Sequence, residues 1–270
     1  DAGFTNLVAS ATGLTSPTWT ADMTLNTSTQ HYWRVWAENA CGTGAYSAVW
    51  SFTTVAAPGD CAPGSTPRVV FSEGYEGGLG SWTTPPGTGT NTWTLSTVNP
   101  HSGSRHVRGT DPSAISDQRL VSPPIALPAG ENPVVLKFWH LPNLENSSSG
   151  CWDGGILEVT TNAGATWTQV PNSALLVGPY VGTVSSTYSN PLAGLQAWCG
   201  PTSQPYMNTI ADVTTWAGQT VQFRWRLGSD SSVGRTGWDV DDIMVQSCLA
   251  GLFADGFESG DLTQWSATAP

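Results

Sequence analysis

The sequence has few positive charges, and Lys137 is its only lysine. Lysine and arginine together number 9 against 20 aspartates and glutamates, which gives a formal net charge of −11 at pH 7. Without a basic patch the chain cannot neutralise a phosphate backbone, so nucleic acid is not an expected partner. The acidity suits either a bound divalent cation or a secreted protein that charge keeps in solution.

Long hydrophobic runs and helix-forming stretches are scarce as well. No apolar stretch approaches the roughly 20 residues of a membrane-spanning helix, so we expect no membrane insertion. Gly (30), Pro (19) and Trp (14) are abundant instead. This composition favours an all-β protein that is rich in turns.

Enzymatic motifs are missing. The sequence has no HExxH, GxSxG or P-loop motif, and its 4 histidines show no metal-ligand spacing. Glu158 is the one glutamate in the middle of a predicted strand, and its outward position indicates solvent rather than a catalytic pair. We therefore expect no catalytic residues.

The 5 cysteines form no CxxC pair, which argues against a zinc ribbon or a thioredoxin-like site. Widely spaced cysteines in a turn-rich chain are typical of disulfides in an oxidising compartment. We therefore expect a secreted, extracellular protein.

Residues 1–56 end in two expected strands, His31–Ala37 and Ala48–Thr54. The run LNTSTQHYWRVWAENACGTGAYSAVWSFTT resembles the second half of a fibronectin type III domain, where a tyrosine opens strand F and a WSFTT-like motif closes strand G. The resemblance implies a partial sandwich, which would expose its core and an unpaired edge. Because the chain starts in mid-pattern and without a signal peptide, we expect the missing strands in a longer parent chain.

Residues 57–67 are rich in Pro, Gly and Ala and predict a linker. A second unit, residues 68–249, shows about eight to ten alternating segments, which fits a jelly-roll β-sandwich. The predicted fold class is all-β, a partial fibronectin type III sandwich plus a jelly roll. Residues 250–270 contain a repeat of the motif at Phe71–Trp82, so they begin a second copy or form a short tail.

Several motifs of the second unit occur together and in order: EGYEGGLGSW, HSGSR, RLVSPPIAL, DGGILEVTTNAGATW, AGQTVQFRWRL and GWDVDDIMV. In this combination the unit resembles the MAM-like jelly-roll accessory modules of secreted immune-inhibitor-type metallopeptidases. The resemblance implies a module that binds, spaces or stabilises, with a protein or polysaccharide surface as partner. Residues 171–206 fit the pattern poorly and look like an insertion.

The strand Thr236–Ser247 is expected to close the sandwich. Alternation places Asp241 on the inward face with the apolar residues that follow it, and Asp242 on the opposite face. We place Asp239 on the outer face without a role. A carboxylate that points toward a core must be paired, hydrogen-bonded or bound to metal.

First and last strands are neighbours in a jelly roll, which could bring Glu76 close to Asp241. Asp242 is a further candidate ligand. The resemblance implies a structural calcium ion here, completed by carbonyls of the first strand and of the turn near Ser102. The alternative is that Glu76 and Asp241 accept backbone hydrogen bonds or pair with arginines. Asp153, which precedes two glycines, is explained by turn chemistry or by a second ion.

The same adjacency of first and last strands should bring Cys61 close to Cys248, and we predict a disulfide between them. Cys151 and Cys199 lie in long loops and should pair with each other. Cys41 is then either free or joined to a missing segment.

Trp152, Trp198 and Tyr180 lie in loops, where an exposed ring could stack on a pyranose. The alternative is that loop tryptophans cap a sheet edge, whereas Trp167 and Trp225 belong to the core by alternation. The predicted function is a non-catalytic accessory or binding module. The alternatives are a carbohydrate-binding module or small jelly-roll glycosidase, and an adhesin or surface-protein segment.

Overall fold

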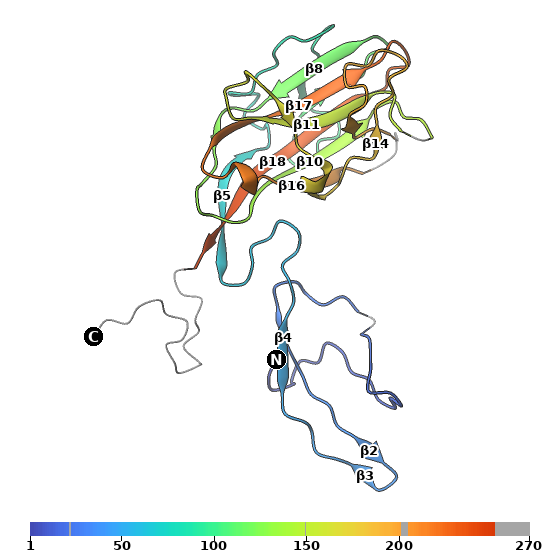
Figure 1. Ribbon diagram of the computed structural model, residues 1–270, viewed down its shortest axis with the longest axis vertical. Coiled ribbons are helices and arrows are strands. Elements are labelled where there is room, and N and C mark those ends of the chain that lie inside the picture. Colours follow the sequence, from blue (N-terminus) through green and yellow to red (C-terminus); the bar gives the residue numbers. More distant parts are fainter. Residues whose placement is uncertain (22, 149, 201–204, 252–270) are drawn as a thin grey trace, which may run out of the picture.

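The computed structural model describes residues 1–251 except 22, 149 and 201–204. Two β-sheets pack into a sandwich, and one long, interrupted hairpin precedes it (Figure 1). Helix in the described residues is limited to the 3-10 turns η1 (Asn172–Ala174) and η2 (Thr214–Trp216). Neither of these turns could span a membrane. The fold is all-β, as predicted.

The larger sheet has seven strands and is built around β18 (Gly237–Ala250). Its neighbours on β18 are β10 on one side and β7 and then β5 on the other, all antiparallel. The other strands of this sheet are β5 (Ser65–Glu73), β6 (Thr94–Ser96), β7 (His106–Gly109), β10 (Val134–Asn143), β13 (Leu175–Val177) and β16 (Met207–Asp212). The first and last strands of the sandwich are therefore neighbours, as predicted.

The smaller sheet has five strands around β17 (Thr220–Ser229). β11 pairs with one side of β17, and β8 and β9 pair with the other. The other strands are β8 (Ser116–Val121), β9 (Ile125–Ala126), β11 (Gly154–Thr160) and β12 (Thr168–Gln169). Alternation along β17 sends its apolar side chains into the core and its arginines outward, as predicted.

Aromatic rings fill the space between the two sheets. Phe138 and Trp225 are fully buried, with ring centroids 5.3 Å apart. His140 lies among these rings and accepts a hydrogen bond from Trp238 Nε1 at 3.0 Å, while its Nε2 lies 2.9 Å from Thr209 Oγ1. Burial lowers the pKa of His140 to about 3, so it is a neutral core residue.

A β-bulge in β18 corrects the predicted face of Asp241. Asp242 has a positive φ of 46°, and the register against β10 shifts near this point. Val240 and Ile243 both belong to the core, although strict alternation would put them on opposite faces. Because the bulge adds one residue, Asp241 lies on the outer face of the sheet, and the predicted inward face was wrong.

Residues 30–53 form one interrupted hairpin, in which the expected strands His31–Ala37 and Ala48–Thr54 are confirmed in part, as β1 and β4. The elements of the hairpin are β1 (Gln30–Trp33), β2 (Glu38–Asn39), β3 (Gly42–Thr43) and β4 (Trp50–Thr53). β1 pairs with β4, and Trp33 stacks on Trp50 at 6.1 Å with both rings about half exposed. The resemblance to half a fibronectin type III domain stays a prediction. The repeat within residues 252–270 lies outside the described residues.

Of the predicted insertion, residues 171–206, the structure describes 171–200, 205 and 206, and these are an integral part of the sandwich. Strand β13 of this segment extends the larger sheet, and β14 (Gly182–Thr183) pairs with β15 (Gln196–Ala197). Leu192 and Trp198 from this segment are fully buried. The segment therefore contributes to the core instead of extending from it.

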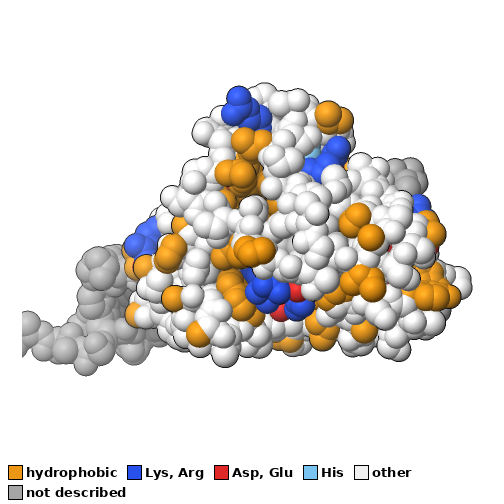
Figure 2. All heavy atoms as spheres, turned by 90° about the horizontal axis from the view of Figure 1, so that it is seen from above, with side chains coloured by type: hydrophobic (Ala, Val, Ile, Leu, Met, Phe, Trp, Pro, Cys, Tyr) orange, Lys and Arg blue, Asp and Glu red, His pale blue; other side chains and the backbone are white. Residues whose placement is uncertain are grey.

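Both predicted disulfides are confirmed. The Cα–Cα distance is 5.4 Å in Cys61–Cys248 and 5.7 Å in Cys151–Cys199, and Cys41 is free and exposed. Figure 2 views the molecule from the sandwich end. Hydrophobic side chains on this face lie in small separate groups, and basic and acidic side chains meet in one place.

Candidate binding site

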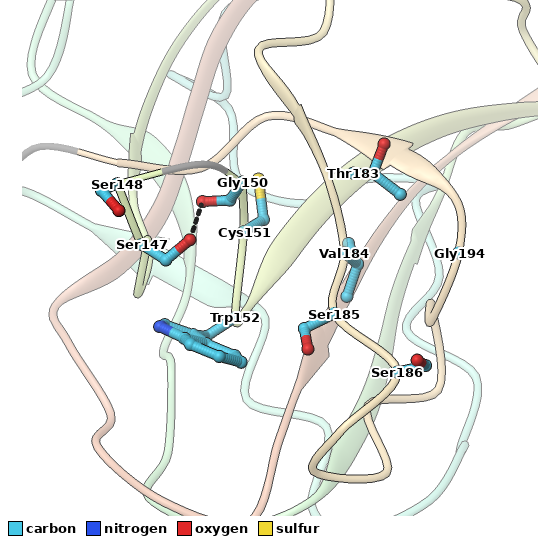
Figure 3. Close-up of a pocket in the computed structure, with 10 residues that line it drawn as sticks. All are labelled: Ser147, Ser148, Gly150, Cys151, Trp152, Thr183, Val184, Ser185, Ser186 and Gly194. Carbon is cyan, nitrogen blue, oxygen red and sulfur yellow. Dashed lines mark hydrogen bonds between the residues drawn. The ribbon is translucent and has the colours of Figure 1, made fainter.

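An open pocket lies where the Cys151–Cys199 disulfide joins the loop before β11 to the β14–β15 hairpin. Its volume of about 520 Å³ is within the range of small-molecule sites. The lining residues, drawn in Figure 3, are Ser147, Ser148, Gly150, Cys151, Trp152, Thr183, Val184, Ser185, Ser186 and Gly194.

Hydrogen bonds hold the two sides of the pocket together. Cys151 N donates to Thr183 O at 3.1 Å, and Ser185 N donates to Cys151 O at 2.8 Å. Asn190 Nδ2 donates to Trp152 O at 2.9 Å. These bonds and the disulfide fix the pocket walls, so the pocket is a built feature of the fold.

Trp152 supplies the aromatic surface of the pocket. Its ring is half-buried and lies 5.3 Å from the ring of Tyr188, which is 47% exposed. In Figure 3 the Trp152 ring lies between the segments that carry Ser147 and Ser185. The pocket thus combines apolar ring surface with hydroxyl groups. Tyr188 was not predicted, because its segment shows no regular pattern in the sequence.

Trp198 and Tyr180, the other two residues predicted to bind sugar, belong to the core. Trp198 is 0% exposed, and its Nε1 donates to Gly178 O at 2.9 Å. Tyr180 is 7% exposed, and its hydroxyl donates to Val170 O at 3.1 Å. The prediction was wrong for both because the segment that carries them packs onto the sandwich and buries its rings.

Glu76, Asp241 and Asp242 meet at one turn, residues 101–105. Glu76 accepts two backbone N–H bonds from this turn, of 2.8 and 2.9 Å, and Asp241 accepts two of 2.9 and 3.3 Å. Asp242 contacts the Nδ1 of His101 at 2.6 Å and accepts a serine hydroxyl at 2.9 Å. Such hydrogen bonds are what we expected at Glu76 and Asp241 as the alternative to a calcium ion. A calcium ion at this turn stays a prediction.

Asp239 forms a buried ion pair with Arg108 and contacts His106, which corrects its placement as an outward residue without a role. It is 3% exposed, and its carboxylate lies 2.8 Å from Arg108 Nη2 and 3.2 Å from His106 Nε2. Burial alone would raise the pKa of Asp239, but the bonds from Arg108 and His106 outweigh it and lower this pKa. The prediction was wrong because side chains from β7 cover this part of the outer face.

Glu158 is also paired rather than solvated. It is 5% exposed, with Oε2 at 2.6 Å from Arg224 Nη2 and Oε1 at 3.5 Å from Arg226 Nη1. Arg226 also lies 2.7 Å from Asp117. The ring of Trp167 covers the Arg224 guanidinium at 4.3 Å, so Trp167 lies on the outer face and not in the core as predicted.

No protein-family model matches this chain, and no curated protein matches it. Solved structures are similar in fold. The K3 adhesin domain of the Lys-gingipain of Porphyromonas gingivalis has 17% identity, covers 66% of this chain and 98% of its own, and gives a TM-score of 0.40. TmCBM61, a structure in complex with β-1,4-galactotriose, has 12% identity, covers 66% of this chain and 97% of its own, and gives a TM-score of 0.39. The Endo-D glycoside hydrolase domain of Streptococcus pneumoniae has 11% identity over 61% of this chain and 21% of its own, with a TM-score of 0.37. Such values leave the function to be inferred from this chain's own residues.

Proposed function

We propose that this chain is a non-catalytic binding module of an extracellular protein and that it holds a carbohydrate against Trp152. The observation that carries the proposal is the open pocket lined by the half-buried Trp152 ring and several serines, with the Tyr188 ring 5.3 Å from that of Trp152. A ring face packs against the C–H face of a sugar, and hydroxyls exchange hydrogen bonds with sugar hydroxyls. Two disulfides support the extracellular setting. A peptidase or other exoenzyme as parent protein stays a prediction from the resemblance.

The pocket lining and the ion-paired acids Asp117 and Glu158 support binding rather than hydrolysis. None of the pocket-lining residues is acidic. Burial opposes ionisation of Asp117, but the bonds from Arg226 and Arg119 lower its pKa overall. Glu158 is held between two arginines. A glycosidase needs a carboxylic acid that keeps its proton for the leaving group, and the lowered pKa of Asp117 does not meet that need.

Replacing Trp152 with alanine should weaken binding of a matching polysaccharide at least about tenfold, or ~1.4 kcal/mol, because the stacking surface is lost. The ligand is found first by affinity electrophoresis against a panel of plant, fungal and bacterial polysaccharides. Its oligosaccharides are then titrated by calorimetry, and chromatography of the recovered sugar should show it uncleaved.

Trp167→Ala is the matched control, since Trp167 lies outside the pocket lining. We expect this variant to bind within about twofold of the unmodified chain. The proposal is wrong if no polysaccharide in the panel is retarded, or if both variants lose the same affinity.

We also propose a structural calcium ion at Glu76, Asp241 and Asp242. Asp241 is fully buried, and its pKa is raised first by burial and also by the neighbouring Asp242 charge. The buried hydroxyl of Tyr75 has no hydrogen-bond partner, and burial, Glu73 and Asp241 raise its pKa. A cation beside these oxygens would offset the repulsion.

Asp241→Asn should bind one calcium ion fewer than the unmodified chain in calorimetric titration. Asp60→Asn is the control, since Asp60 is an exposed partner of Lys137, and it should bind as many ions as the unmodified chain. Equal stoichiometry in all three proteins would show that the carboxylates at this turn act only as hydrogen-bond acceptors.

A further inference from the structure

Four carboxylates that do not belong to the Glu76 turn converge at one end of the sandwich. Asp111 follows β7, Glu145 follows β10, Asp153 precedes β11 and Asp230 follows β17. Oxygen atoms of Glu145, Asp153 and Asp230 all lie within 4.8 Å of one another. Asp111 lies close enough to Asp153 for its charge to raise the pKa of Asp153.

The cluster is buried and contains carboxylate oxygens without partners. Asp111, Asp153 and Asp230 are 4%, 0% and 2% exposed. Asp111 Oδ1 and Asp153 Oδ2 accept no hydrogen bond. Among the described residues, no salt bridge within 4 Å involves any of the four acids. Burying a charged oxygen without a partner costs several kcal/mol, so these oxygens need a proton or a cation.

The other oxygen of each aspartate is held by a backbone N–H group. Asp230 N donates to Asp153 Oδ1 at 2.6 Å, Ser232 N to Asp230 Oδ1 at 2.8 Å, and Arg235 N to Asp111 Oδ2 at 3.2 Å. Each carboxylate is therefore fixed in orientation while one oxygen remains available. This is the arrangement of a preformed ligand set.

We propose that Asp111, Glu145, Asp153 and Asp230 bind a divalent cation, and that the cation is calcium. Every donor in the set is a carboxylate oxygen, and no imidazole or thiolate takes part, which selects a hard cation over zinc or copper. Calcium accepts six to eight oxygens in flexible geometry, whereas magnesium keeps several waters that this buried cluster does not favour. The pKa values support the need for charge compensation: burial and then Asp111 raise that of Asp153 to about 9.

The ion would also fix the loop that carries Trp152. The backbone N–H groups of Trp152 and Asp153 both donate to Glu145 O, at 3.0 Å each. Glu145 and Asp153 thus stand at the two ends of the loop that lines the pocket. This cation site rests on the cluster and on its buried unpartnered oxygens, and it does not depend on the proposed sugar ligand.

The test is thermal melting of the 270-residue chain in a chelator and in 10 mM calcium chloride or magnesium chloride. All variants carry Glu76→Gln, which disables the other proposed ion site. At about a hundredfold excess over Kd, calcium should raise the Tm of Glu76→Gln by about 5–10 °C, and magnesium should raise it less. Adding Asp153→Asn should abolish this rise. In the chelator the Asp153→Asn protein should melt close to the Tm of its parent, because burial raises the pKa of Asp153 and the amide replaces a carboxyl group that is neutral without the ion.

The effect of Asp153→Asn on the Tm in calcium, compared with its effect in the chelator, distinguishes an ion site from a purely structural role. If Asp153→Asn lowers the Tm equally in calcium and in the chelator, the aspartate is only a hydrogen-bond acceptor and the proposal is wrong. The proposal is equally wrong if calcium does not raise the Tm of Glu76→Gln, or if it raises the Tm of the Asp153→Asn protein by the same amount.

Discussion

Replacing Cys61 and Cys248 together with alanine should lower the free energy of unfolding by ~5 kcal/mol in the chain-entropy account of disulfides. The bond joins residues 187 apart in sequence, so nearly the whole sandwich lies inside the loop that it closes. Without it, the unfolded chain gains conformational freedom, and the ends of β5 and β18 lose their covalent link. Urea unfolding followed by tryptophan fluorescence measures the effect. We expect a lower midpoint and a somewhat larger m-value, because the unfolded chain is less compact.

Cys41→Ser is the control for this experiment. Cys41 is exposed and free, so its replacement should change the free energy of unfolding by less than about 0.5 kcal/mol. The chain-entropy account would fail for this protein if the double variant stayed within about 1 kcal/mol of the unmodified chain.

The pairing of Cys61 with Cys248 could be predicted from the expected order of the strands. Once a jelly roll is expected, its first and last strands must be neighbours, and cysteines just outside them must meet. The Cα–Cα distance of 5.4 Å between Cys61 and Cys248 follows from this constraint. The main strands of both sheets were predictable for a similar reason, because alternation reports which face of a strand is buried.

The face of Asp241 was not predictable, because alternation assumes an unbroken ladder. One residue in a left-handed conformation, Asp242, moves every later side chain to the other face. An aspartate adopts that conformation more readily than most residues, but two adjacent aspartates give no sign of which one bulges. The same sequence fits both registers, and only packing against β10 decides between them.

Burial in the loops was not predictable either. Trp198 and Trp152 both lie outside alternating strands, yet the first is fully buried and the second is half-buried in the pocket wall. The difference comes from the fold of residues 171–200, which buries Trp198 and whose short strands carry no periodic signal. The acidic cluster is a related case. Its four acids stand at strand ends, and their meeting depends on a strand order that the sequence does not state.

Replacing Glu158 with alanine should lower the free energy of unfolding by about 3–5 kcal/mol, the range for breaking one side of a buried ion pair. The side chains of Glu158 and Arg224 are 6% and 9% exposed, and their charged atoms lie 2.6 Å apart. Arg226 would keep Asp117 as a partner, but no other ion pair among the described residues holds Arg224. The cost therefore comes from an arginine left buried without an anion. Urea unfolding again provides the measurement.

A double variant distinguishes this cost from the value of the pair itself. Glu158→Leu with Arg224→Met removes both charges and keeps most of the packed volume, so it should be much more stable than Glu158→Ala and close to the unmodified chain. Arg68→Ala, at an ion pair whose arginine side chain is 51% exposed, should cost no more than about 1 kcal/mol. If Glu158→Ala and Arg68→Ala lose the same stability, the outer face of the smaller sheet is wetter than its geometry indicates. If instead the double variant is as unstable as Glu158→Ala, the two charges contribute net stability to the sheet, and Arg224 is more than a partner that must be neutralised.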